Sequence, residues 1–416
     1  MTRWAQDPFA FGSYSYLAVG SSNRDRELLA TPVADRLFFA GEATRTDYPS
    51  TVHGAYLSGQ RAAAEVRERA DGGATVIVIG AGMAGLAAAR ALGDHYRVVV
   101  LEGRDRIGGR VWTSRELGAP LDLGASWIHG AERANPIANL AKRFGIVTKP
   151  TDWDNNVLYG PNGGEISDRA QNRISREFAS VVADASAERK GRNDDIPLGD
   201  ALTRAIAAGS SDPTRRRDLE YAIGFNIEHD YAADVSQLSL LHWDDDEEIA
   251  GADRLFPGGY EQIAQRLAKK LDIRLGHLVE RLEYSGAGVT VTTDHATVTG
   301  DDVVVTLPVG VLQRDAVEFA PPLPDNKRQA IGRLGMGLLD KCYLRFPRVF
   351  WDRDVDVINY ISLGKGRWAE WINIAKYTGE PILLGFNAAT YAQQLEGMSD
   401  ADVVASALNV LRTIYQ

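Results

Sequence analysis

The chain has 416 residues, of which 44% are hydrophobic and 25% charged, so it can bury large cores and is neither disordered nor fibrous. Its 56 acidic residues outnumber its 46 basic residues, and the formal net charge of -10 argues against nucleic acids and anionic membranes as partners. A single cysteine excludes an internal disulfide, and no uninterrupted apolar run approaches the roughly 18 residues that a membrane-spanning helix needs. Because the N-terminal residues also lack the pattern of a secretory signal, we expect a cytoplasmic protein.

A short strand and a long helix are predicted at the beginning of the chain. Residues 36–40 (RLFFA) are an apolar run that leads into Gly41 and Glu42, which is typical of a strand followed by a tight turn. Residues 50–69 contain helix formers after a start of small residues, and DGG at 71–73 ends the pattern.

A βαβ unit is predicted next. Residues 75–80 (TVIVIG) and 96–102 (YRVVVLE) are continuous apolar runs rich in β-branched residues, as in buried parallel strands. The segment between them, GAGMAGLAAARAL, predicts a turn and a helix.

The rest of the chain predicts a helical region followed by a region rich in strands. Residues 135–250 are mostly polar helical stretches, and residues 258–310 predict a helix and then short alternating strands. In the last hundred residues we expect two strands, with the sequences DKCYLRF and PILLGFNA, and a terminal helix. At roughly 100–200 residues per domain, this length predicts at least two domains.

The strongest local motif is the glycine triplet Gly80-x-Gly82-x-x-Gly85, which follows an apolar strand and opens a helix. Glycines allow a tight turn and close approach of the backbone to a pyrophosphate, and the helix N-terminus adds partial positive charge. Glu102 ends the next strand, where a carboxylate accepts hydrogen bonds from a ribose. The motif therefore favours FAD or NAD over the alternative, a glycine turn that binds nothing.

A second glycine element follows in GRDRIGGRVWT (103–113), where Gly109 permits a bend and Arg110 can meet a phosphate or a flavin carbonyl. Nicotinamide enzymes do not need this element. Together with DLGASWIHG (122–130), it resembles the flavin-containing amine oxidase superfamily, whose members include polyamine oxidases and the lysine-specific histone demethylase. Further segments with this resemblance occur along nearly the whole chain.

The resemblance implies a fold of the α/β plus α+β class, in which a Rossmann-like FAD-binding domain joins a substrate domain of mixed helices and sheet. Both domains are expected to be discontinuous in sequence. The FAD-binding domain would comprise residues 27–135 and 251–310, and the substrate domain residues 1–26, 136–250 and 311–416.

The resemblance also implies which residues bind FAD. RLFFAGEAT places Glu42 at the dinucleotide, and the helix start at Thr51 and Val52 would stabilise the reduced flavin ring. Val279 would pair with adenine through its backbone, and Trp4 would pack near the flavin. No cysteine lies in the flavin-facing segment, so we expect FAD to be held without a covalent bond. The complete predicted set is Trp4, Glu42, Thr51, Val52, Gly80, Gly82, Gly85, Glu102, Arg104, Gly109, Arg110, Ser126, Trp127 and Val279.

Four residues are expected to act in catalysis. Lys341 matches the family's active-site lysine, which holds a water beside flavin N5, whereas periodicity alone describes a solvated strand lysine. Tyr14 would form an aromatic wall of the substrate cavity, or would simply be core. His129 lies where polyamine oxidases carry His or Glu, although a lone histidine is more often an ordinary loop residue. Thr51, at the flavin ring, is the fourth of these residues. No metal site is expected.

The order of these segments differs from that of the family. Residues 1–72 carry motifs that come last in the relatives, and the dinucleotide-binding strand begins only at Thr75, so we expect a circular permutation. The alternatives are a rearranged sequence or one copy cut from a tandem repeat. A permutation predicts that Met1 and Gln416 lie near each other, and that residues 58–69 pack beside the strand at 75–79.

The expected reaction is FAD-dependent oxidation of a primary or secondary amine, most of all a polyamine or acetylated polyamine, with oxygen reduced to hydrogen peroxide. The imine product would hydrolyse to an aldehyde and a smaller amine. The partners are thus a small-molecule amine and oxygen, and the oligomeric state is left open. Two alternatives are an L-amino acid oxidase, which needs a cavity arginine, and a flavoprotein scaffold without catalysis.

Overall fold

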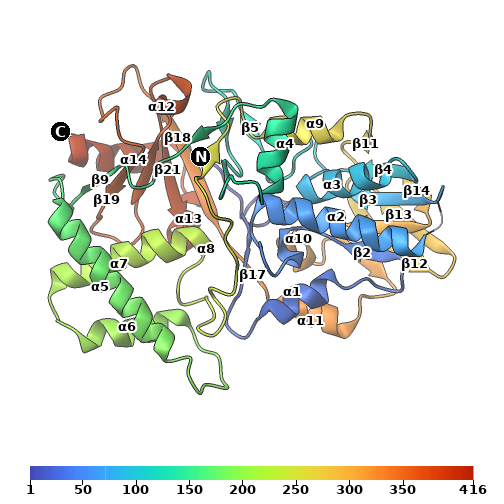
Figure 1. Ribbon diagram of the computed structural model, residues 1–416, viewed down its shortest axis with the longest axis horizontal. Helices are drawn as coiled ribbons and strands as arrows, with labels where there is room; N and C mark the ends of the chain where they lie inside the picture. Colours follow the sequence, from blue (N-terminus) through green and yellow to red (C-terminus); the bar gives the residue numbers. More distant parts are fainter. Residues whose placement is uncertain (71, 416) are drawn as a thin grey trace.

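The computed structural model describes residues 1–70 and 72–415, and its helices and strands form two halves, each around its own sheet (Figure 1). Asp71 and Gln416 lie outside the described residues. Two expectations therefore lie outside them as well: that Asp71 helps to end the helix, and that Gln416 lies near Met1. Among the described residues, every helix is too short or too polar to cross a membrane.

The first half is built on a five-stranded sheet in which all neighbouring strands are parallel. Its order is β11 (Asp272–Arg274), β4 (Arg97–Leu101), β3 (Thr75–Ile79), β15 (Asp302–Val305) and β2 (Leu37–Phe39). Both faces are covered, which explains why these strands are continuous apolar runs. The predicted βαβ unit and the strand at 36–40 are confirmed.

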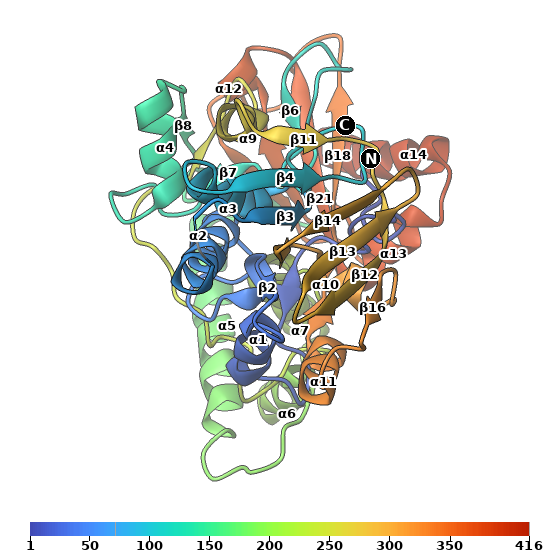
Figure 2. The same cartoon turned by 90° about the vertical axis from the view of Figure 1, so that its right-hand side faces the viewer.

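Alternate residues of β3 point into two different cores. Val76 and Val78 pack against α2 (Val52–Arg69) and α3 (Met83–Leu92), with α4 (Pro136–Phe144) and α9 (Glu261–Ala268) beside them. Ile77 and Ile79 face a second sheet, which forms a layer of its own in Figure 2. That sheet consists of β14 (Thr297–Gly300), β13 (Gly288–Thr293), β12 (Val279–Ser285) and β16 (Glu318–Ala320).

The second half is built on another five-stranded sheet, shown at the left of Figure 1. Its order is β18 (Leu339–Arg345), β21 (Ile382–Ala388), β20 (Glu370–Asn373), β19 (Val357–Tyr360) and β9 (Asn156–Tyr159). The helices α5 (Asp168–Ala187), α6 (Leu198–Ala208), α7 (Pro213–Ile223), α13 (Ala389–Glu396) and α14 (Asp400–Tyr415) complete this half. The predictions of β18, β21 and α14 are confirmed.

The mainly helical interpretation of residues 135–250 was wrong for one segment. β9 lies within that range and pairs in parallel with β19, although only Val157 and Leu158 of its four residues are buried. Two adjacent apolar residues are too few to give a periodic signal. The strand forms because its backbone pairs with β19.

The N-terminal residues run between the two halves. Residues Ser15–Tyr16 (β1) pair with Gly335–Met336 (β17). The backbone N–H of Thr2 donates to the carbonyl oxygen of Lys341 at 2.9 Å, and the Thr2 hydroxyl donates to Asp340 at 2.7 Å. The segment therefore extends the half that carries β18.

The prediction that residues 58–69 pack beside β3 is confirmed. Ala62, Ala63 and Val66 of α2 share a core with Val76 and Val78. The helices α2 and α3 also approach closely, because a Cβ added at Gly59 would lie 2.1 Å from the carbonyl oxygen of Ala84.

We expect Gly59→Ala to lower the free energy of unfolding by about 1–3 kcal/mol, the usual cost of overpacking, because α2 must move away from α3. Gln60→Ala is the matched control, since Gln60 is the next residue of the same helix and is exposed, and its effect should stay within about 0.5 kcal/mol. Urea denaturation of both variants checks this. Equal midpoints would contradict the close helix contact.

Candidate active site

The glycine turn after β3 has the geometry of an anion-binding site. Gly80 has a φ of +101°, and a Cβ at Gly85 would lie 1.9 Å from the Gly80 carbonyl oxygen, so both positions require glycine. A Cβ at Gly82 would meet nothing within 4 Å, and no side chain caps the N-terminus of α3. This open space at a positive helix end fits the pyrophosphate of a dinucleotide.

Glu102 joins this turn to the strand that begins at Val279. Its buried carboxylate accepts from the backbone N–H groups of Ala81 at 2.7 Å and Arg104 at 2.9 Å. Its carbonyl oxygen accepts from the N–H of His277 at 2.9 Å, two residues before Val279. The residues predicted for pyrophosphate, ribose and adenine are thus neighbours.

The second glycine element packs against the first. The N–H of Gly108 donates to the carbonyl oxygen of Ala81 at 2.9 Å, and a Cβ at Gly109 would lie 3.3 Å from the Gly82 Cα. Arg104 differs from its predicted role, because its guanidinium donates to Asp7 at 2.8 Å and lies over the Phe9 ring. It fastens the N-terminal segment to the dinucleotide-binding half.

Glu42 is the centre of a buried polar cluster. Its carboxylate accepts from Arg110 at 2.9 Å, from the Ser15 hydroxyl at 2.7 Å and from the Ser50 N–H at 3.0 Å. Burial by itself would raise the pKa of Glu42, but the charges of Arg110 and Arg26 hold it below its usual value. Glu42 therefore remains ionised.

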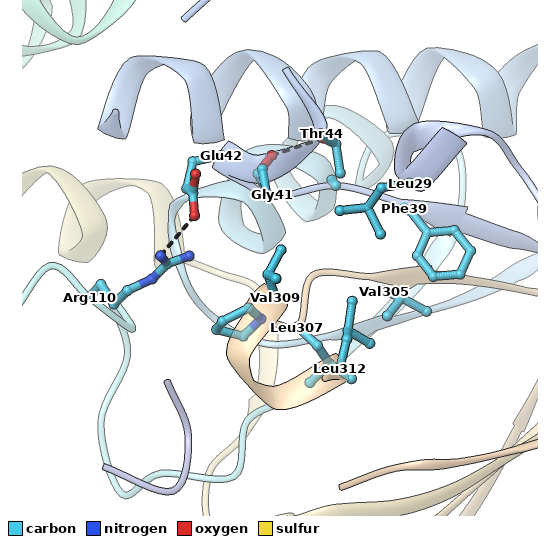
Figure 3. Close-up of a pocket in the computed structure, with 13 residues that line it drawn as sticks. Leu29, Phe39, Gly41, Glu42, Thr44, Arg110, Val305, Leu307, Val309 and Leu312 are labelled. Atoms are coloured by element: carbon cyan, nitrogen blue, oxygen red, sulfur yellow. Dashed lines mark hydrogen bonds and ion pairs between the residues drawn. The ribbon is translucent and has the colours of Figure 1, made fainter. Parts of the chain in front are cut away.

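A hollow lies beside this cluster, at the carboxyl ends of β2 and β15, where ligands bind in parallel α/β sheets. Figure 3 shows Arg110 directed at Glu42 on one side of it and apolar side chains on the other. Its lining residues are Leu29, Phe39, Ala40, Gly41, Glu42, Ala43, Thr44, Arg110, Val305, Leu307, Pro308, Val309 and Leu312.

The N-terminus of α2 is held next to Glu42. Val52 is the first residue of the helix, and Thr51 caps it by accepting from the Gly54 N–H at 2.9 Å. The Thr51 hydroxyl also donates to the carbonyl oxygen of Tyr48 at 2.9 Å. The positive end of this helix therefore lies in the same cluster as Ser50 and Glu42.

Lys341 is buried, so the interpretation of a solvated strand lysine was wrong. Its ammonium donates to the carbonyl oxygens of Gly124 at 2.5 Å and Asp122 at 3.1 Å, and to the Ser126 hydroxyl. It also lies 5.5 Å from the centre of the Trp127 ring. The structure thus brings Lys341 together with Ser126 and Trp127, two of the residues predicted to bind FAD, and with Asp122.

The surroundings of Lys341 shift two acid–base equilibria. Burial lowers the pKa of Lys341 to about 7, although the charge of Asp122 works in the opposite direction. Burial also raises the pKa of Asp122 to about 6, while hydrogen bonds from Thr113 and the Tyr260 N–H lower it. A lysine in this state can exchange a proton near neutral pH.

Tyr14 and His129 lie beside an acidic cluster formed by Asp230, Asp253 and Glu370. The Tyr14 hydroxyl donates to the carbonyl oxygen of His229 at 2.8 Å. Nδ1 of His129 lies 2.9 Å from a carboxylate oxygen of Asp253. Although the His129 side chain is exposed, the protein around it by itself would lower the pKa of His129, but Asp253 and Asp230 raise it above its usual value.

Three candidate residues in and beside the acidic cluster were not predicted from the sequence: His229, Asp230 and Glu370. Nδ1 of His229 lies 2.7 Å from Oε2 of Glu370, and both side chains are buried. Although solvent reaches Asp230, the protein around it and the charge of Glu370 raise its pKa to about 7. The one available signal was Glu370 itself, a carboxylate within the apolar run WAEWINI.

Trp4 is buried in an apolar cluster with Ala10, Leu338 and Ala392, and its ring lies 6.2 Å from that of Trp112. Its backbone N–H donates to Asp340 at 3.3 Å, next to Lys341. Trp4 therefore supports the strand that carries the lysine.

Two separate segments of the chain, residues 1–67 and 83–416, match the family described as flavin containing amine oxidoreductase. The chain belongs to this family. It is therefore an FAD-dependent enzyme that oxidises amines, and the glycine turn, Glu102 and the Glu42 cluster are suited to hold the cofactor.

Relatives support the same assignment. The chain is 34% identical over 353 residues to polyamine oxidase 4 of Oryza sativa subsp. japonica, covering 81% of this chain and 72% of the rice protein. It is 35% identical over 342 residues to polyamine oxidase 2 of Arabidopsis thaliana, covering 78% and 69%. A structure of putrescine oxidase bound to putrescine has the same fold, with a TM-score of 0.64 at 21% identity over 82% of this chain and 81% of the other.

Proposed function

We propose that the substrate of this amine oxidase is a polyamine or acetylated polyamine. The observation that carries the proposal is the acidic cluster, where Asp230 and Glu370 lie near Tyr14, and Asp253 and Asp230 lie near His129. Carboxylates attract the ammonium groups that a polyamine carries beyond the reacting nitrogen. Relatives named polyamine oxidase support the same choice.

The bound FAD supplies the electron acceptor, so that the amine becomes an imine and oxygen becomes hydrogen peroxide. The residues of the chain bind and orient. Glu102 would accept hydrogen bonds from the ribose, and the N-terminus of α2 at Thr51 would stabilise negative charge on the reduced ring. Tyr14, whose hydroxyl donates to the His229 carbonyl oxygen, would help to orient the amine.

Lys341 accepts the proton that the substrate nitrogen must lose. The amine must be neutral before a hydride leaves the adjacent carbon, and a neutral lysine can accept that proton through a bound water. Ser126 and the carbonyl oxygens of Asp122 and Gly124 hold the Lys341 nitrogen in position. Cys342, the single cysteine, is buried in a core on β18, so we infer that FAD is held without a covalent bond.

A substrate panel tests the proposal. Hydrogen peroxide release should be faster with spermidine, spermine and their acetylated forms than with monoamines, because only they offer further nitrogens to the acidic cluster. L-amino acids should be poor substrates, since the carboxylates of the cluster would repel their carboxylate. Faster turnover of amino acids would favour the L-amino acid oxidase, and a flavin that no amine bleaches would favour the scaffold.

The pH profile tests Lys341. Because its pKa is lowered to about 7, flavin reduction at low substrate concentration should rise with pH through about 7 as the lysine loses its proton. Lys341→Met should keep FAD, lose this inflection and slow flavin reduction or reoxidation by about 100-fold, the lower end of what proton-transfer groups contribute. Lys149→Met is the control, since Lys149 is exposed and bonds only backbone carbonyls. Equal stopped-flow rates for wild type and Lys341→Met would remove Lys341 from the mechanism.

We also propose that the chain is a circular permutation with two discontinuous domains, although the bounds expected from the sequence need to shift, because α4 and β16 pack in the first half. The family match is interrupted at 68–82, around the junction of α2 and β3. Pairwise matches cover 78–82% of the chain, and residues 75–416 account for 342 of its 416 residues. Arg3 bonds Asp400 at 2.6 Å, so the N-terminal segment and the start of α14 belong to one surface.

A rearranged chain tests the permutation. It would run from Thr75 to Gln416, continue through a Gly/Ser linker of about 12 residues that spans roughly 20 Å, and end with residues 1–70. FAD affinity and the unfolding midpoint should match those of the original, because the same contacts form. Residues 75–416 alone are the control and should not hold FAD, since they lack Glu42 and α2. Loss of FAD from the rearranged chain would contradict the permutation.

A further inference from the structure

We propose that Asp122 is a positioning residue for Lys341, because its carboxylate fixes the loop at 122–126 beside the lysine ammonium and sets how tightly that ammonium keeps its proton. This role deepens the proposed function, since it rests on the proton transfer proposed above for Lys341. It concerns the side chain of Asp122, whereas the contact described above uses only its backbone carbonyl oxygen.

The Asp122 carboxylate is buried where a strand and a helix meet. It accepts from the Thr113 hydroxyl at 2.5 Å, on the paired strand β5 (Thr113–Ser114), and from the Tyr260 N–H at 3.0 Å. Tyr260 directly precedes α9, so the carboxylate lies at the positive end of this helix. The Glu261 N–H donates in turn to the Thr113 hydroxyl at 3.3 Å. These contacts hold the carboxylate in place and favour its ionised form.

The loop at 122–126 is also fixed by the second glycine element. The Leu123 N–H donates to the carbonyl oxygen of Trp112 at 2.7 Å. A Cβ at Gly124 would lie 1.7 Å from the carbonyl oxygen of Arg110, so the two segments are in close contact. The carbonyl oxygens of the loop that accept from the ammonium can therefore move little.

The lysine nitrogen is surrounded by acceptors that carry no formal charge. An ammonium has three N–H donors, and its partners here are the carbonyl oxygens of Asp122 and Gly124 and the hydroxyl of Ser126. The site therefore satisfies a charged lysine but needs a negative charge to balance it. The carboxylate of Asp122 supplies that charge through space, because it bonds Thr113 and the Tyr260 N–H instead of the lysine.

The other titratable groups that face this carboxylate come from α9 and β18. After burial, the charge of Glu261 is among the causes that raise the pKa of Asp122, although Glu261 is itself paired with Arg115 at 2.5 Å. Tyr343 on β18 donates its hydroxyl to the Asp122 carbonyl oxygen at 2.9 Å. Burial raises the pKa of the Tyr343 and Tyr260 phenols, so both stay neutral. Asp122 is thus the charge that acts on the lysine.

Asp122→Asn tests this role, because it removes the charge but keeps a side-chain oxygen that can accept the same hydrogen bonds. Burial lowers the pKa of Lys341 and the charge of Asp122 opposes this effect, so the variant should lower that pKa further, by about 1 pH unit, the lower end for a nearby charge. NMR of the lysine Cε resonances in isotope-labelled holoenzyme measures the pKa, with Lys341 identified by its loss in Lys341→Met. The inflection in the pH profile of flavin reduction should move down equally.

Tyr343→Phe is the matched control, because Tyr343 bonds the carbonyl oxygen of the same residue and its loss leaves the carboxylate charge in place. The pKa of Lys341 should not change in this control. Thr113→Val is a second variant in case Asp122→Asn does not fold. It removes a hydrogen bond that favours the ionised carboxylate, so it should lower the pKa of Lys341 in the same direction but by less.

Two outcomes separate this role from the proposed function. An unchanged pKa of Lys341 in both Asp122→Asn and Thr113→Val would overturn the role of Asp122, whatever the rate of flavin reduction. A lowered pKa in Asp122→Asn, together with normal flavin reduction in Lys341→Met, would support the effect of Asp122 on the lysine and overturn the proton transfer assigned to Lys341.

Discussion

The active-site architecture depends on keeping the buried carboxylate of Glu42 ionised. An unpaired charge at this depth would be strongly unfavourable, so its partners must be in place before the charge is tolerated. Those partners come from distant parts of the chain: Ser15 in the N-terminal segment, Ser50 before α2, and Arg110 in the second glycine element. One carboxylate thereby fixes three segments around the place where the flavin is expected.

In the second half of the molecule, a row of side chains stands on the five-stranded sheet and not on a loop. Lys341, Phe386 and Glu370 stand on adjacent strands, so their spacing is set by backbone hydrogen bonds and not by flexible connections. The loop that carries Ser126 closes over one end of the row through the lysine ammonium. Rigid strands of this kind suit an enzyme that must position a C–H bond accurately.

The sequence predicted those elements whose signal is local. Strands such as β3 are continuous apolar runs because both of their faces are covered, and the glycine turn carries its spacing in six residues. β20 was missed because Glu370 interrupts its apolar pattern, and β9 because two buried residues make no period. The burial of Lys341 was also invisible from periodicity, since residues of the loop at 122–126 cover it.

The acidic cluster shows the same limit more strongly. His229 and Glu370 are 141 positions apart, and nothing in either neighbourhood indicates the other. Their pairing arises only when the helical region folds onto the sheet. Thr51 caps α2 and Ser126 accepts from the Lys341 ammonium, two contacts that no local sequence pattern indicates.

The anchoring of Thr2 ties two distant parts of the sequence together. The hydroxyl of Thr2 accepts from the Lys341 N–H at 2.8 Å, while its own N–H donates to the Lys341 carbonyl oxygen. A substitution at Thr2 therefore acts directly on the strand that carries the lysine, although the two residues are 339 positions apart.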